Sequence, residues 1–488
     1  MRKVYVRELK PYSLIGLSEL FGVSFDETRL LLEDLIVRGI VRFRTGDLDS
    51  VEHSEDGEDA AFDELYQFRF VGLVMAYDLV VVSYPKYYRD DIPGDDELRL
   101  IMRALKRSGG LLVSSSLEDE DEKIDSRLPV MLALLELYGE YGEYSNYVEC
   151  REINGGGSID WNRTISRHLP IFSDGRPVYT EFETRKMLRD DSDYITRLHR
   201  AVLTECSREF CEAGVCELLS IDGVWLSDEE VDEFGDVETL EWRLNRERTS
   251  QFVDWKLSTL DLLERYLLGR DSKARKNEIK TLGTTSFYHL WELACGVAFG
   301  NVLGNRLGSL GLELVGRWAA RKDDTLLGII PRPHWERVSD NGYVDCGDVD
   351  TLIPDIASFV TDDQDRKLFC IYDAKYYVPS RSGRMMYQPG LESVTKQFLY
   401  QSAYKEFIED QGFDAVVNAF LVPGNVDEPE LMARVSFPEV MAGEQAPLSN
   451  YIYMWALPAN KVLDAYLCEG KLYDIALAMI GGAAFEAS

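Results

Sequence analysis

Two short apolar segments near the C-terminal end of the chain carry three charged residues within them or directly after them. This pattern constrains the fold most. The segments extend from Leu352 to Val360 and from Leu368 to Ala374, with a polar stretch between them. Such segments pair as an antiparallel hairpin. The hairpin would place Asp355 on its first strand and Asp373 on its second, with Lys375 two residues further on. Because side chains alternate along a strand, Asp373 and Lys375 should point to one face.

Two carboxylates beside an ammonium group suit the hydrolysis of a phosphodiester bond. This reaction uses a divalent ion to stabilise charge on the phosphate and to activate water. Mg²⁺ prefers oxygen ligands, which Asp355 and Asp373 supply, and we expect Mn²⁺ to substitute. Lys375 can orient the water and offset the negative charge of the transition state. The alternative is an exposed strand with a salt-bridged Asp and Lys, because an isolated DxK triplet is common.

A predicted helix before the hairpin adds a further acid. The stretch SFYHLWELACGVAFGNVLGNRL predicts a helix from about Ser286 to Asn305, in which Glu292 lies among apolar neighbours. A buried carboxylate is costly unless it is paired or bound to a metal. We therefore predict Glu292 as a metal ligand, with a structural salt bridge as the alternative.

The helix predicted after the hairpin, ESVTKQFLYQSAYKEFIEDQG, carries polar residues at helical spacing. Gln397, Gln401 and Tyr404 share roughly one face, and Lys396 lies on the next stripe. We predict Gln397 and Gln401 as site residues that hydrogen-bond metal-bound water, and Lys396 and Tyr404 as DNA contacts. A half-buried amphipathic helix without such a role is the alternative.

The formal net charge of −33 opposes DNA binding by the isolated chain, because phosphate contacts depend on Lys and Arg. Acidic residues gather in blocks at Asp47 to Glu64, Glu118 to Glu122 and Asp228 to Glu233. Such blocks are usually solvated loops, with a docking surface for a basic partner as the alternative. We expect another subunit to grip the duplex.

The N-terminal region has the pattern of a winged helix. Residues 13–45 read as a short apolar helix, a Gly-Val-Ser turn, a second amphipathic helix and a β-rich segment. The second helix and the wing carry four basic candidates for DNA contact, which are Arg29, Arg38, Arg42 and Arg44. Winged helices also dock proteins, so both functions remain open.

The whole chain is predicted to be an α+β protein of several domains. A winged-helix and β-rich domain occupies residues 1–115, a mostly helical domain 127–275, and a mixed sheet flanked by helices 280–488. The glycines at 155–157 lack a following GK[ST], which favours a tight turn over a phosphate loop.

Other patterns exclude several protein classes. The sequence has no apolar run long enough to span a membrane, and its charged start is unlike a signal peptide, so we expect a cytoplasmic protein. The eight cysteines contain no CxxC pair, and we expect reduced thiols rather than a zinc site.

The sequence resembles the LlaJI-type restriction endonuclease subunits, which are themselves similar to McrC. The residues that carry the resemblance include FRFVGLVMAYDLVVVSYPKYY, INGGGSIDWNRTI, FYHLWELACGVAFGN, IPDI, YDAKYY and TKQFLYQSAY. The resemblance implies a PD-(D/E)XK nuclease core in which Asp355, Asp373 and Lys375 match the PD and DAK elements. Glu292 is similar to the helix acid. The spacing of Gln397 and Gln401 from Tyr404 departs from the QxxxY element of the McrC family.

The resemblance also implies a separate McrB-like AAA+ GTPase as partner. The sequence contains no Walker A motif, so a nucleotide-driven step would come from another chain. Our leading hypothesis is the nuclease subunit of an anti-phage restriction system that cuts double-stranded DNA. A modification-dependent McrC-like type IV subunit and a non-catalytic scaffold with a nuclease fold are the alternatives. The oligomeric state of the chain stays open.

Overall fold

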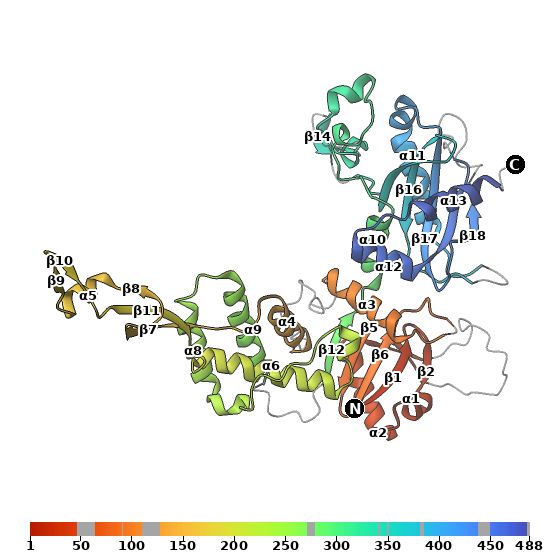
Figure 1. Cartoon of the computed structure of the whole chain (residues 1–488). Helices are drawn as coiled ribbons and strands as arrows, with labels where there is room; N and C mark the ends of the chain where they lie inside the picture. The colour runs from red at the N-terminus through yellow and green to blue at the C-terminus, as the bar shows by residue number, and fades with distance from the viewer. Residues whose placement is uncertain are drawn as a thin grey trace. The chain divides into compact units, whose positions relative to one another are not determined.

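The computed structural model in Figure 1 describes most of the chain. The described residues are 1–45, 64–89, 91–109, 127–270, 279–339, 342–348, 351–380, 385–437 and 449–485. The acidic block at Glu118 to Glu122, and all of the block at Asp47 to Glu64 except Glu64, therefore lie outside the described residues. Chain contacts divide the protein into two units. Unit 1 comprises Met1–Arg2, Met75–Asp78 and Asp125–Thr281, and unit 2 comprises Lys3–Val74, Leu79–Ile124 and Leu282–Ser488.

The N-terminal part of unit 2 begins with a small helical and β-sheet module. Its elements are β2 (Pro11–Ser13), α1 (Leu14–Phe21), α2 (Phe25–Val37), β3 (Val41–Thr45) and β4 (Glu64–Phe68), and the sheet has the order β2-β4-β3. Gly22 ends α1 in the left-handed conformation, and a capping box between Ser24 and Glu27 begins α2. The order of helix, turn, helix and strand is the order that the sequence predicts for a winged helix.

A second sheet, with the order β1-β6-β5-β12, joins distant parts of the sequence. It comprises β1 (Arg2–Arg7), β5 (Val71–Ala76), β6 (Leu79–Tyr84) and β12 (Lys280–Thr284). Two glycines allow β5 and β12 to approach closely. A Cβ atom on Gly72 would lie 2.3 Å from the Leu282 carbonyl oxygen, and one on Gly283 would lie 2.3 Å from that of Val71. Helix α3 (Asp95–Arg107) follows this sheet.

Unit 1 contains a group of helices and a β-rich arm. The helices are α4 (Arg127–Tyr141), α6 (Tyr194–Glu212), α7 (Cys216–Leu219), α8 (Val237–Arg248) and α9 (Asp254–Arg270), with the short 3-10 helix η2 (Val231–Phe234). The third acidic block lies at η2 and is partly ion-paired rather than wholly solvated. Glu229 binds Arg197, and Glu230 binds Arg208 at 3.4 Å.

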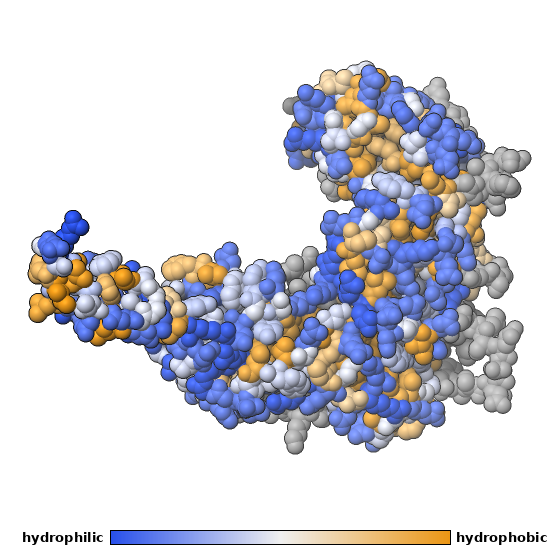
Figure 2. Space-filling model, in the orientation of Figure 1, coloured by the Kyte–Doolittle hydropathy of each residue, from blue (hydrophilic) through white to orange (hydrophobic). Residues whose placement is uncertain are grey.

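The prediction of a mostly helical middle domain misses a β-rich arm in unit 1, labelled at its strands in Figure 1. The arm comprises β7 (Tyr147–Ile153), β8 (Ser158–Ile159), α5 (Trp161–Arg167), β9 (Ile171–Ser173), β10 (Arg176–Val178) and β11 (Glu183–Arg189). Strands β7 and β11 pair in antiparallel register from Tyr147↔Arg189 to Ile153↔Glu183. Asp174 and Gly175, both with positive φ, turn the β9–β10 hairpin. Figure 2 shows apolar side chains gathered on the arm.

The C-terminal part of unit 2 contains a mixed five-stranded sheet. Its strands, in the order β15-β16-β17-β19-β18, are β15 (Ile356–Thr361), β16 (Lys367–Ala374), β17 (Ala415–Gly424), β19 (Ile452–Pro458) and β18 (Glu430–Val435). Strands β15 and β16 form the antiparallel hairpin that the sequence predicts, whereas β17 runs parallel to both β16 and β19. A separate hairpin pairs β13 (His334–Ser339) with β14 (Gly342–Asp348).

Four helices accompany this sheet. They are α10 (Phe287–Ala298), α11 (Leu391–Asp410), α12 (Ala459–Cys468) and α13 (Tyr473–Phe485). Helix α10 is shorter than predicted and is followed by Gly300 in the left-handed conformation, where a helix commonly stops. Glu469 adopts a left-handed conformation after α12 and ends that helix before α13 begins. None of the helices in the described ranges is long and apolar enough to cross a bilayer.

Candidate active site

The C-terminal end of β16 carries the central ion pair of the candidate site. Asp373 is the second-last residue of the strand, and Lys375 lies just beyond it. The Lys375 Nζ atom lies 2.9 Å from Oδ1 and from Oδ2 of Asp373. Asp373 is almost fully buried and Lys375 is half-buried. The two side chains therefore meet on one side of the strand end, as their two-residue spacing predicts.

Asp355 approaches the same strand end from β15. It lies one residue before this strand rather than within it, because the ladder begins with the pair Ile356↔Tyr372. Its Oδ2 atom accepts a hydrogen bond of 2.9 Å from the Ala374 backbone N–H group. This bond links Asp355 to the residue between Asp373 and Lys375, so the three charged residues are brought together.

Asn301, which was not predicted as a site residue, binds the backbone on both sides of Ile356. Its Nδ2 atom donates to the Asp355 carbonyl oxygen at 3.0 Å, and its Oδ1 atom accepts from the Ala357 N–H group at 3.2 Å. One side-chain amide thus spans the residues on both sides of Ile356. We infer that Asn301 fixes the backbone from which Asp355 projects.

The electrostatics of the site show an excess of negative charge. Burial, a hydrogen bond with Asp373 and the charges of Asp373 and Glu292 together raise the pKa of Asp355 to about 8, and the charge of Lys375 opposes that rise. One ammonium group is therefore too little to hold the pKa of Asp355 at its usual value. Oxygen donors with surplus negative charge are the ligands that a divalent cation such as Mg²⁺ prefers. The residues present thus fit the metal that the sequence predicts.

Glu292 lies on α10 and is half-buried. Its charge reaches Asp355 and also the buried thiol of Cys295, whose pKa is raised well above its ordinary value, first by burial and then by Asp355 and Glu292. Among the described residues, however, no group of three or more acidic, His or Cys side chains lies close enough to hold one ion. Asp355 and Asp373 form the pair, and Glu292 stays a prediction as the third ligand.

A main-chain oxygen of β17 connects α10 with the end of β16. The Leu421 carbonyl oxygen accepts from the Trp291 Nε1 atom at 3.0 Å and from the Lys375 N–H group at 2.9 Å. Trp291 is fully buried and precedes Glu292. The helix that carries Glu292 and the residue that carries the ammonium group are thereby bonded to one atom.

Helix α11 presents Tyr400, rather than the predicted Tyr404, toward the acids. The Tyr400 hydroxyl donates to the Ile353 carbonyl oxygen at 2.9 Å. Burial, followed by the charges of Asp373 and Asp355, raises the pKa of Tyr400 to about 12. Tyr404 is fully buried, and its hydroxyl donates to the Leu326 carbonyl oxygen at 3.2 Å. The Tyr404 side chain has no exposed surface in this structure, and its role as a DNA contact stays a prediction.

Gln397 and Gln401 are also fully buried between α11 and the sheet. Gln397 Nε2 donates to the carbonyl oxygens of Ile371 and Ala419 at 3.4 and 3.3 Å, whereas Gln401 Oε1 accepts from the Ser449 N–H group at 2.9 Å. Within the described part of the chain, the Gln397 Oε1 and Gln401 Nε2 atoms have no hydrogen-bond partner. The hydrogen bonds that the two side chains do make bind helix to sheet, and a catalytic role for either glutamine stays a prediction.

The other predicted DNA contacts are basic residues of α11 and of the N-terminal module. Lys396, on the exposed side of α11, pairs with Glu392 at 2.6 Å. Arg29 lies exposed on α2, Arg38 is half-buried at its end, and Arg42 and Arg44 lie exposed on β3. Arg42 and Arg44 project from the face opposite Phe43, whose ring contacts that of Tyr66. The four arginines remain candidates for a basic surface of the N-terminal module.

Comparisons with known proteins give a family for this arrangement. The family model described as LlaJI restriction endonuclease matches residues 70–306 and 323–440, a span that contains Glu292, Asp355, Asp373 and Lys375. A relative from Bacillus subtilis (strain 168), "Type II restriction enzyme BsuMI component YdjA", is 26% identical over 381 residues, covering 75% of this chain and 74% of that protein.

Two solved structures are also similar. One is the refined half-complex from the tetradecameric assembly of Thermococcus gammatolerans McrB AAA+ hexamers with bound McrC, at 13% identity, 96% and 99% coverage of the two chains and a TM-score of 0.36. The other is the Thermococcus gammatolerans McrBC complex, at 12% identity, 56% and 88% coverage and a TM-score of 0.22. The family match extends over most of the sequence and includes the whole hairpin with its three charged residues. The chain belongs to the LlaJI restriction endonuclease family.

Proposed function

We propose that this chain is the DNA-cleaving subunit of a restriction system and that Asp355, Asp373 and Lys375 form its active site. The observation that carries the proposal is the convergence of the three side chains at the ends of β15 and β16, joined by the Asp355 bond to Ala374 and the Asp373–Lys375 ion pair. Membership of a restriction endonuclease family supports a nuclease function.

In the proposed reaction, Asp355 and Asp373 would hold Mg²⁺, and Glu292 would approach it from α10. The bound ion would supply charge stabilisation at the scissile phosphate and a more acidic water. Lys375 keeps a positive charge beside Asp373, where it can orient the attacking water and balance charge that develops on the phosphate. Tyr400 and Asn301 hold the backbone at Ile353 and Asp355, which keeps the acids in place.

We further propose that a McrB-like AAA+ GTPase is the partner, as the resemblance to LlaJI and McrC implies. This chain has no Walker A motif of its own, and the Bacillus relative is itself named as a component of a restriction enzyme. The arm of unit 1 is the described surface that best fits a protein partner. Its apolar side chains are exposed, which is unusual for a protein that works alone. They include Trp161, Ile165, Leu169, Ile171 and Phe172.

The test of the proposed function is cleavage by the assembled system. The full chain would be mixed with the AAA+ protein of its own system, GTP, Mg²⁺ and plasmid DNA, and compared with Asp373→Ala. We expect at least a ~1000-fold loss of cutting, because the metal contribution amounts to several kcal/mol. We also expect EDTA to abolish cutting by the wild-type chain.

Asp363→Ala is the matched control, because Asp363 lies exposed in the β15–β16 turn. It should cut like the wild type. Undiminished cutting by Asp373→Ala would refute the site. Absence of metal-dependent cutting by the wild type in a correctly assembled complex would favour the non-catalytic scaffold.

A further inference from the structure

The segment that follows Lys375 is held by the N-terminal part of unit 2. Tyr376 is buried, and its hydroxyl donates a short hydrogen bond to the carboxylate of Glu8. Glu8 directly follows β1, and its own N–H group donates to the Tyr84 carbonyl oxygen at 2.9 Å. A residue near the start of the chain thus binds the residue next to the proposed catalytic lysine.

Lys86 completes this contact. Its N–H group donates to Glu8 Oε2 at 3.2 Å, and its Nζ atom lies 4.1 Å from the centroid of the Tyr376 ring. Burial raises the pKa of Glu8, and the charge of Lys86 opposes that rise. A buried acid is retained at a cost in free energy unless its partners compensate for the lost water. Here the partners are Tyr376 and Lys86, so the acid is tied to one arrangement.

Arg89 extends the contact along the same segment. Its Nη2 atom donates to the Val378 carbonyl oxygen at 2.6 Å and also to that of Pro379. The segment from Tyr376 to Pro379 is therefore held by the N-terminal part of the unit through the side chain of Tyr376 and through two backbone carbonyl groups. Lys375 lies between this clamped segment and the end of β16, where its N–H group binds Leu421.

Tyr376 also contacts the helix that carries Glu292. Its ring centroid lies 5.1 Å from that of Phe287, the first residue of α10, and the Tyr87 ring lies 6.4 Å from Phe287. The loop around Lys86 and Tyr87 thus contacts both elements that bring proposed catalytic groups to the site. These contacts therefore lie next to the two elements that carry Glu292 and Lys375.

We propose that Glu8 is a positioning residue for DNA cleavage, because its bond to Tyr376 fixes the segment that sets the position of Lys375. This inference rests on the proposed nuclease function. It implies that the N-terminal residues complete the active-site geometry of the C-terminal sheet. Displacement of a catalytic group by about 1 Å can cost on the order of 100-fold in rate, so loss of one such bond should be visible in kcat.

The test compares two small changes on the two sides of the bond. In the assembled system with GTP and Mg²⁺, Glu8→Ala and Tyr376→Phe should each lower kcat about tenfold, while KM for DNA stays within about twofold. Glu8→Gln should keep most of the activity, because its amide oxygen can still accept from Tyr376. The double variant should be no slower than the slower single variant, since both changes remove the same bond.

Glu19→Ala and Tyr473→Phe are matched controls, because both residues are exposed in unit 2. They should leave kcat unchanged. Tyr376→Phe removes a single oxygen and keeps the ring, so it remains informative if Glu8→Ala fails to fold.

The outcomes separate this inference from the proposed function. If Asp373→Ala is inactive but folded Glu8→Ala and Tyr376→Phe proteins keep wild-type kcat, the positioning role is overturned and the nuclease stands. A lower melting temperature with unchanged kcat would likewise overturn it, because the bond would then be only structural. If Asp373→Ala cuts like the wild type, the nuclease proposal itself fails.

Discussion

The five-stranded sheet of unit 2 and the arm of unit 1 break the usual pattern of burial in opposite ways. The sheet buries polar side chains, with Asp373, Gln397 and Asn418 almost or fully enclosed. The arm exposes apolar ones, with Leu169 at 94% and Phe172 at 70% of their full exposure (Figure 2). Each exception carries a cost, because buried polar groups lose water and exposed apolar groups gain ordered water.

The contrast indicates a different function for each region. In the sheet, the acids gather around one point and leave surplus negative charge, which suits a divalent cation. On the arm, the apolar residues spread along a hairpin and a helix without gathering into a core, which suits a second protein. We therefore propose that the chemistry takes place at the sheet and that the arm recognises the partner.

The largest effect should come from removing the cation of the sheet. Lys375→Met keeps the length of the side chain but leaves Asp373 without its partner, and we expect cutting to fall by about 100- to 1000-fold. Single-turnover cleavage of plasmid DNA measures this. Lys367→Met, at the exposed start of the same strand, is the control. A loss of cutting of less than twofold for Lys375→Met would contradict the proposal that the sheet carries the catalytic residues.

The arm should respond in binding rather than in chemistry. Leu169→Asp combined with Phe172→Asp should weaken binding of the AAA+ partner by at least ~30-fold, a size typical of central apolar contacts. Because both side chains are exposed, the melting temperature of the isolated chain should not fall. Phe252→Asp, also highly exposed in unit 1 but outside the arm, is the control. Equal weakening by the control would contradict a specific role for the arm.

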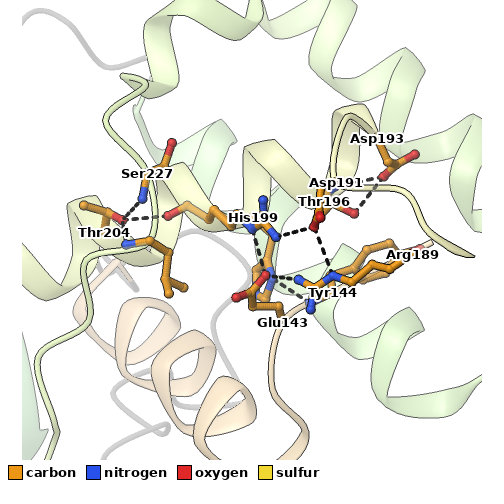
Figure 3. Close-up of polar contacts among 11 residues, drawn as sticks. Glu143, Tyr144, Arg189, Asp191, Asp193, Thr196, His199, Thr204 and Ser227 are labelled. Carbon is orange, nitrogen blue, oxygen red and sulfur yellow. Dashed lines mark hydrogen bonds and ion pairs between the residues drawn. The ribbon is translucent and has the colours of Figure 1, made fainter. Parts of the chain in front are cut away.

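The root of the arm sharpens the comparison, because its polar side chains are paired with one another. Glu143 pairs with Arg189 from the end of β11, as Figure 3 shows, and with Arg200 of α6 at 2.7 Å. Nearby, His199 Nδ1 accepts from the Tyr144 N–H group at 3.0 Å. This bond requires a neutral imidazole at Nδ1, because a proton there would face another donor.

The pH dependence of stability follows from His199. Burial lowers the pKa of His199 to about 4 in the folded chain, below its ordinary value near 6.5. The unfolded chain therefore binds the proton first, and stability is present above about pH 6.5 and is lost as the pH falls toward 4. The linked loss is about 3 kcal/mol. Chemical unfolding at pH 7.5 and at pH 4.5 should show a smaller difference for His199→Gln than for the wild type; an equal difference would contradict this account.

The smallest effect concerns a charge that stays outside the sheet. Lys396→Ala removes an exposed ion pair with Glu392, and the melting temperature should not change measurably. If Lys396 contacts a DNA phosphate, its loss should make DNA binding by the assembled complex less sensitive to salt. The slope of the logarithm of the binding constant against the logarithm of salt concentration should fall in magnitude by about one. Lys461→Ala, which removes a similar exposed pair with Glu428, is the control. An unchanged salt dependence would show that Lys396 does not contact a DNA phosphate.

The sequence predicts the centre of the site because that centre is local. Strand alternation fixes the relation of Asp373 to Lys375, and the hairpin brings Asp355 beside them. The helical pattern could not show whether Tyr400 or Tyr404 approaches the acids. Which of the two approaches the acids depends on where α11 lies over the sheet. Asn301 was missed for the same reason, since its partners are more than fifty residues away.

The arm was missed because its apolar residues resemble core residues in a linear pattern. The Ser-Asp-Gly-Arg stretch at 173–176 does carry a hairpin signal, and Asp174 and Gly175 adopt the positive φ values that such a turn requires. A pattern cannot show whether an apolar face is covered by the same chain, by another chain or by neither. Only the exposure of each side chain in the fold decides that.

The oxygen of Leu421 gives the proposed active site an anchor that substitution of the side chain does not remove. Every amino acid at position 421 would present the same carbonyl group, so the tether to Trp291 and Lys375 is independent of side-chain identity. Relatives can therefore diverge widely along β17 and still inherit the same spacing between helix and lysine.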